Sequence, residues 1–83
     1  MGSKMRAKFR IESVLRHDAS ELLKMYAVCK KGTYPADGAD EDNTFARFSP
    51  HGELTLTVAN PDLIGKFNPG DKFYVDFTPV PAE

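Results

Sequence analysis

The chain has 83 residues, 41% of them apolar and 28% charged, and a formal net charge of −1. This composition is typical of a single folded domain, and it excludes a disordered chain and a strongly basic nucleic-acid-binding domain. The sequence holds no run of about 18 apolar residues, which excludes a transmembrane helix. The single cysteine, Cys29, excludes an internal disulfide.

The first predicted strand begins after four N-terminal residues. Residues 1–4 resemble a cloning remnant ahead of a natural start at Met5, and the charged stretch that follows lacks an apolar segment, which predicts a protein that is not secreted. Residues 5–15 alternate with a period of two, and this predicts a half-buried strand. The alternation divides the side chains into an inward set, Met5, Ala7, Phe9, Ile11, Ser13 and Leu15, and an outward set, Arg6, Lys8, Arg10, Glu12 and Val14.

Residues 18–31 fit two structures. Asp18 and Glu21 have the spacing of a helix capping box, and a helical face follows at Leu22, Met25, Tyr26 and Cys29. The same stretch also alternates as a strand, with Leu23, Met25, Ala27 and Cys29 on one face. We favour a strand over residues 21–30, because a hairpin with the first strand would pair the backbone groups of both. The helix stays open as the alternative.

Two further elements follow a long loop. Residues 31–43 hold two glycines, one proline and four acidic residues, which predicts a loop. A short strand is expected over residues 44–48, then a β-turn over residues 49–52 with Pro50 in second position and Gly52 in fourth. The next strand covers residues 53–58. These two strands are expected to form a hairpin.

The last part of the chain predicts a helical turn and a final strand. Residues 60–65 begin with Asn-Pro and end with glycine, which is typical of one capped helical turn. Residues 72–77 form the last strand, with Phe73, Val75 and Phe77 inward, and residues 79–83 are expected to be a loose tail. Residues 5–78 therefore predict one mainly β domain: a small antiparallel barrel or sheet of five strands, of OB or SH3 size, with a helical turn before the last strand.

The second half of the chain resembles a known family. Residues 43–54 read NTFARFSPHGEL, residues 58–61 read VANP, and residues 65–77 read GKFNPGDKFYVDF. This pattern is similar to small uncharacterised proteins of tailed bacteriophages, over residues 43–78 well and over residues 5–31 loosely. The resemblance implies a viral protein that acts in the host bacterial cytoplasm or in the virion. It implies no catalytic or ligand-binding residues.

The residues that carry chemistry do not form a recognisable catalytic or metal motif. The acidic run of residues 37–43 lacks the spacing of a calcium-binding loop, and Lys30-Lys31-Gly32-Thr33 lacks that of a phosphate-binding loop. His17 and His51 lie in predicted turns, and no nucleophile accompanies them. We therefore expect no enzyme activity, no metal and no cofactor.

Two surfaces remain as candidates for binding. Arg6, Lys8 and Arg10 share one strand face and, with Lys24 and the tyrosines Tyr26, Tyr34 and Tyr74, would suit single-stranded nucleic acid or a nucleotide. Val14, Leu22 and Val28 are apolar residues on strand faces predicted to be exposed to solvent, which indicates a protein interface. From the second surface we expect a non-catalytic interaction module that binds a protein partner or forms a homo-oligomer. Nucleic-acid binding is the alternative.

Overall fold

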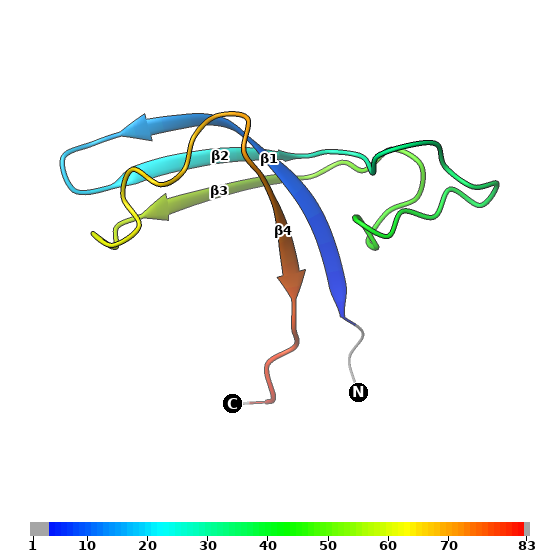
Figure 1. The fold of residues 1–83 in the computed structure, drawn as a ribbon. Helices are drawn as coiled ribbons and strands as arrows, with labels where there is room; N and C mark the ends of the chain where they lie inside the picture. Colours follow the sequence, from blue (N-terminus) through cyan, green and yellow to red (C-terminus); the bar gives the residue numbers. More distant parts are fainter. Residues whose placement is uncertain (1–3, 83) are drawn as a thin grey trace.

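The computed structural model describes residues 4–82, in which four strands form one antiparallel sheet in the order β3-β2-β1-β4 (Figure 1). The strands are β1 (Met5–Arg16), β2 (Glu21–Ala27), β3 (Glu53–Val58) and β4 (Lys72–Phe77). The mainly β class is thus confirmed, with four strands in place of five. Residues 1–3 of the expected cloning remnant lie outside the described range.

The predicted hairpin between the first two strands is confirmed. β1 pairs with β2 from Phe9 opposite Ala27 to Arg16 opposite Glu21. The turn closes through the backbone N–H of His17, which donates to the carbonyl of Ser20 at 2.8 Å. The strand interpretation of this segment is therefore right and the helix is wrong, although β2 ends at Ala27, three residues earlier than expected.

A β-bulge changes the side that β1 presents to the core. Ile11 lies opposite Met25, but the next aligned residue is Ser13, so the register shifts at Glu12. A bulge inserts one extra residue, and the alternation beyond it changes phase. The inward positions expected beyond Ile11 are therefore wrong: Val14 packs against the core, whereas Leu15 is 55% exposed.

The predicted second hairpin is wrong. β3 pairs with β2 along its whole length, from Glu21 opposite Val58 to Tyr26 opposite Glu53. Residues 44–48 do not form a strand and contribute only an isolated bridge between Ala39 and Arg47. The physical reason is that β2 offers β3 a full-length partner. The backbone N–H of Thr44 instead donates to the carbonyl of Arg6 at 2.9 Å, beside the part of β1 that extends past β2.

The predicted helical turn is two successive reverse turns, and this expectation is also wrong. Leu63 donates to the carbonyl of Asn60 at 2.9 Å, and Lys66 donates to that of Leu63 at 3.3 Å. Gly65 lies in the second turn with φ +84°, and its N–H bonds to the side chain of Glu21 at 3.0 Å rather than to a helical carbonyl. Residues 59–71, the crossing connection, carry the chain from β3 across the hairpin, close to its turn, to β4 on the far side of β1 (Figure 1).

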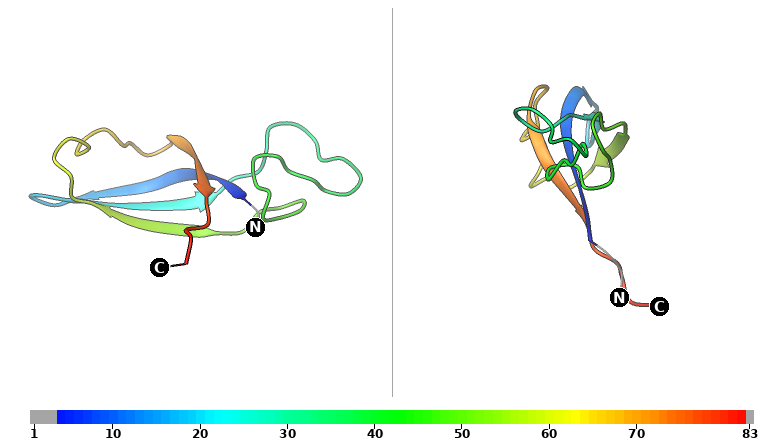
Figure 2. Two further views of the ribbon diagram at one scale, coloured as in Figure 1. Left: turned by 90° about the horizontal axis from the view of Figure 1, so that it is seen from below. Right: turned by 90° about the vertical axis from the view of Figure 1, so that its right-hand side faces the viewer.

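The sheet is a single layer that curls into a half-barrel (Figure 2). Its extents are 47 × 36 × 16 Å, and its radius of gyration is 14.9 Å. A compact domain of this length has a radius of gyration of about 12 Å, so the chain is unusually open. The core is correspondingly small and consists of Ala7, Phe9, Ile11, Leu23, Met25 and Val58.

Candidate interaction surface

One face of the sheet is apolar on all four strands, and we call it the inner face because it lines the inside of the curl. The strand registers place Phe9 opposite Phe73 and Leu23 opposite Leu56, so each pair shares this face. The apolar residues of the inner face are Met5, Ala7, Phe9, Ile11, Val14, Leu23, Met25, Ala27, Leu54, Leu56, Val58, Phe73, Val75 and Phe77. The ion pair of Arg16 and Glu21 lies at the end of this face, beside the hairpin turn. A sheet with one apolar face is stable only when that face is covered.

The crossing connection covers only part of the inner face. Ile64 and Phe67 from this connection pack against the core, and the ring of Phe67 meets that of Phe73 edge-on at 5.5 Å between centroids. Four large apolar side chains remain open to solvent along the two outer strands and the start of β1. They are Met5 at 37%, Leu56 at 49%, Phe73 at 38% and Phe77 at 45% exposure.

A buried carboxylate holds the crossing connection in place. Glu21 is fully buried, and its carboxylate accepts hydrogen bonds from the guanidinium of Arg16 at 2.6 Å and from the N–H of Gly65 at 3.0 Å. The Gly65 N–H lowers the pKa of Glu21; burial opposes this shift, and Arg16 reinforces it. Arg16 also donates to the carbonyl of Phe67 at 3.3 Å. The partial cover of the inner face is therefore fixed by ionic contacts.

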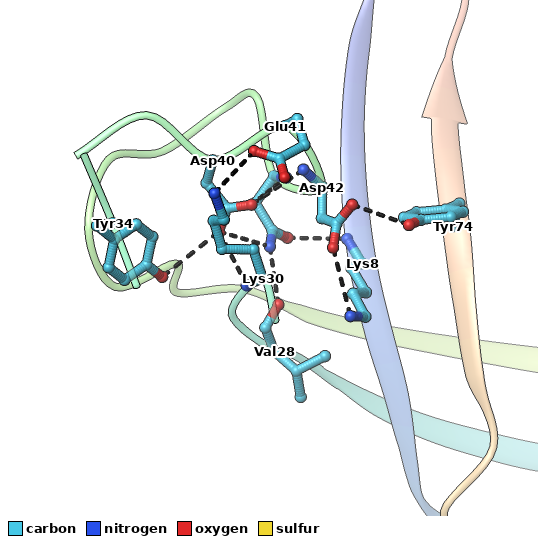
Figure 3. A network of polar contacts seen from close by, with 9 residues as sticks. Lys8, Val28, Lys30, Tyr34, Asp40, Glu41, Asp42 and Tyr74 are labelled. Carbon is cyan, nitrogen blue, oxygen red and sulfur yellow. Dashed lines mark hydrogen bonds and ion pairs between the residues drawn. The ribbon is translucent and has the colours of Figure 1, made fainter. Parts of the chain in front are cut away.

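The opposite, outer face carries the predicted basic cluster, and its cations are paired with carboxylates. Arg6 binds Asp76 at 2.6 Å, and its guanidinium lies 4.4 Å from the ring centroid of Tyr74. The hydrogen bond from Arg6 lowers the pKa of Asp76, although desolvation opposes this. Lys8 binds Asp42 at 3.3 Å, as Figure 3 shows, and the hydroxyl of Tyr74 donates to the same carboxylate at 2.8 Å.

The remaining members of the predicted nucleic-acid site are divided between two places. Arg10 lies 3.8 Å from Glu12 and opposite the exposed Tyr26 on β2, and Lys24 is exposed farther along that strand. Tyr34 lies in the loop, away from β1, where its hydroxyl donates to Asp40 at 3.4 Å (Figure 3). The outer face of the sheet thus carries every member of the set except Tyr34, spread along β1, β2 and β4.

A buried polar centre, formed by Asp40 and Asn43, fixes the long loop to the sheet. The Asp40 carboxylate accepts hydrogen bonds from the side chain and backbone of Asn43 and from the backbone N–H groups of Asp42 and Lys30. Desolvation raises the pKa of Asp40, but these donors outweigh it and hold the pKa below its ordinary value. The Asn43 amide accepts from the N–H of Lys8 at 2.8 Å and donates to the carbonyl of Val28 at 2.7 Å. It therefore bridges two backbone segments as a strand peptide would.

The loop carboxylates are engaged by the protein itself. Beyond the contacts of Asp40 and Asp42, Glu41 binds Lys30 at 3.1 Å and Asp37 lies 3.8 Å from Arg47. Within residues 4–82 no group of three or more histidine, cysteine or acidic side chains is arranged to hold a metal ion. Cys29 is exposed, contrary to the buried position that its strand pattern predicted.

The three residues predicted as an interface do not share one surface. Val14 packs against the core on the inner face because of the bulge, and Leu22 is half-buried on the outer face, opposite Leu15. Val28 follows β2, is half-buried, and donates its N–H to the carbonyl of Lys8 at 2.9 Å. The open apolar surface lies elsewhere, on the inner face, at positions that the alternation of the last two strands had marked as core.

Comparison with known proteins gives no relative: no protein-family model, curated protein or solved structure matches the chain. Among the described residues, no helix has the length and apolar character needed to span a membrane.

Proposed function

We propose that this protein is a non-catalytic interaction module that acts by burying the inner face of its sheet against a second polypeptide. The observation that carries the proposal is the single layer. Folded domains bury an apolar sheet face against another layer, and here the crossing connection provides only part of one. Large apolar side chains that stay exposed on one face are typical of a protein–protein contact.

The outer face supports the proposal by contrast. Its cations Arg6, Lys8 and Arg10 each have a carboxylate within 4.0 Å, so a polyanion would have to displace internal partners. Nucleic-acid binding depends on cations that are free to neutralise phosphates. The geometry therefore favours protein binding through the inner face over the nucleic-acid alternative. The resemblance of residues 43–78 to proteins of tailed bacteriophages is compatible with a virion component or a small host-directed factor.

Site-specific photocrosslinking tests this proposal. A photoreactive phenylalanine derivative replaces Phe77, which is 45% exposed on the inner face, or Tyr26, which is 41% exposed on the outer face. The two positions have similar exposure and differ in the face they occupy. We expect covalent adducts with a second polypeptide, mapped by mass spectrometry, from Phe77 and not from Tyr26. Equal yields from the two positions, or none from Phe77, would overturn the proposal.

A further inference from the structure

We infer that the second polypeptide is another copy of this chain, and that two half-barrels close into one eight-stranded barrel. This inference rests on the proposed function and names its partner. Three independent features carry it: the surface that the single chain leaves exposed, the chemistry of the inner face, and the free edges of the sheet.

The exposed area matches what a dimer needs. The chain exposes 6107 Å², whereas a folded monomer of 9.2 kDa exposes about 4,900 Å². The surplus is about 1,200 Å², which exceeds the roughly 800 Å² that each partner buries in a standard interface. One copy therefore has enough surplus surface to form a stable dimer.

The inner face suits a copy of itself. Its large exposed apolar members are Met5, Leu56, Phe73 and Phe77. The charged pair on this face, Arg16 with Glu21, is neutralised within the chain, so it requires no opposite charge on a partner. In a two-fold symmetric dimer the same patch occurs on both subunits, and an uncharged apolar patch meets this condition without like-charge repulsion.

The edges of the sheet are open for pairing. β3 and β4 are the outermost strands, have six residues each, and run in opposite directions. Among residues 4–82, no hydrogen bond from outside the sheet reaches the backbone of residues 53–58 or 72–77. β3 also lacks the proline, lysine or bulge with which proteins commonly protect an edge. An edge of this kind is suited to pairing with another strand.

The strand directions and side chains favour β3 of each copy pairing with β4 of the other. Because β3 and β4 run in opposite directions, β3 of one copy is antiparallel to β4 of the other when the two-fold axis coincides with the barrel axis. A register with Leu56 opposite Val75 of the second copy places Leu54 against Phe77 and Val58 against Phe73. Each aromatic ring then meets an aliphatic side chain, as cross-strand pairs favour. An eight-stranded barrel has an interior just wide enough for side chains to fill.

Light scattering on the purified chain is the first test. We expect about twice the mass of 9.2 kDa, at both about 0.1 M and about 1 M salt, since the contact is apolar. Leu56→Asp places an unpaired carboxylate in each half of the interface and should weaken the dimer at least about 100-fold. Tyr26→Asp is the matched outer-face control and should leave the dimer intact. Circular dichroism establishes that both variants keep their sheet.

Intermolecular disulfides test the barrel itself. In a Cys29→Ser background, one chain carries Leu56→Cys and another carries Val75→Cys. Opposed residues in paired strands have Cα atoms about 4.5–5.5 Å apart, within the reach of a disulfide. We expect a mixed disulfide when the two chains are combined and oxidised, and none from either chain alone or when Tyr26→Cys replaces Val75→Cys.

The outcomes separate this inference from the proposed function. A dimer without the mixed disulfide, or with disulfides from either variant alone, would overturn the closed barrel. A chain that stays monomeric while the photoreactive Phe77 position captures a different polypeptide would overturn the self-association and leave the proposed function standing. A monomer that captures nothing from Phe77 would overturn both.

Discussion

The strongest test of how the long loop is anchored is Asn43→Ala. Asn43 is fully buried. Its side-chain amide accepts a hydrogen bond from the N–H of Lys8 at 2.8 Å and donates one to the carbonyl of Val28 at 2.7 Å. Alanine would leave both backbone groups without a partner. An unsatisfied buried group costs about 1–3 kcal/mol. Because the two backbone groups are only partly buried, we expect a loss of about 2–4 kcal/mol, out of a total stability of about 4–12 kcal/mol for a chain of this length.

Urea denaturation at neutral pH and fixed protein concentration measures this loss, since the stability of the dimer that we propose would depend on protein concentration. Thr44→Val is the matched control. The Thr44 hydroxyl accepts the N–H of Arg6 at 2.9 Å, which is the same kind of bond on the same strand, but in an exposed position. Water can replace it, so the expected cost is under about 1 kcal/mol. If Asn43→Ala costs no more than Thr44→Val, the loop is not held by the buried amide.

Three further predictions concern the core, the ionic contact and the loop. Leu23→Ala, at a residue only 1% exposed, should cost about 2–5 kcal/mol in urea denaturation. Because the pKa of Glu21 is lowered in the folded state, its ionised carboxylate contributes its full stabilisation above pH 4.5, the ordinary pKa of the group. This stabilisation is lost as the pH falls through the lowered pKa. Glu21→Gln should therefore be less stable at neutral pH and lose less stability on acidification, as urea denaturation at several pH values would show. Gly38→Ala should lower the melting temperature more than Gly70→Ala, because both residues have positive φ but a Cβ at Gly38 would also overlap the ring of Phe48.

The strands could be predicted where apolar and polar residues alternate over several consecutive positions. Residues 5–11 alternate without interruption, and Leu54, Leu56 and Val58 mark the inward face of β3. The hairpin tip was also accessible, because a polar segment separates two alternating runs. Such signals depend on neighbouring residues in the chain, and the sequence contains them directly.

The errors arose where distant residues decide the structure. Glu12 is a strand residue by pattern, and only pairing with β2 shows that it forms a bulge. Residues 44–48 have the composition of a strand, but β3 pairs with β2 and leaves them outside the sheet. Residues 60–65 carry helix-capping residues, yet the N–H of Gly65 bonds to Glu21, which is 44 positions away in sequence. In each case a long-range contact outweighed a local preference.

The candidate site shows the same division. Placing the basic residues on one strand face was correct, because alternation alone decides it. Their partners Asp42 and Asp76 lie far along the chain, so the pairing that neutralises them could not be read from spacing. Glu21 is in phase with Leu23 and Met25 and so falls on their strand face, but nothing near it in sequence shows that the N–H of Gly65 would bind it. Asn43 lies in the predicted loop, and no local signal marks it as a buried bridging group.

The open apolar surface follows from the number of layers, which composition does not reveal. Phe73 and Phe77 alternate as core residues, and with a second layer above them they would be buried. In this fold the chain after β3 connects to β4 at the far edge of β1. Within residues 4–82, the large apolar side chains from outside the strands that pack against the core are Phe45 of the long loop and Ile64 and Phe67 of the crossing connection. The same residues that a sequence pattern marks as core thus become the exposed face of a half-barrel. In the dimer that we propose, a second copy of the chain buries these residues, and the edge strands β3 and β4 supply the pairing between the copies.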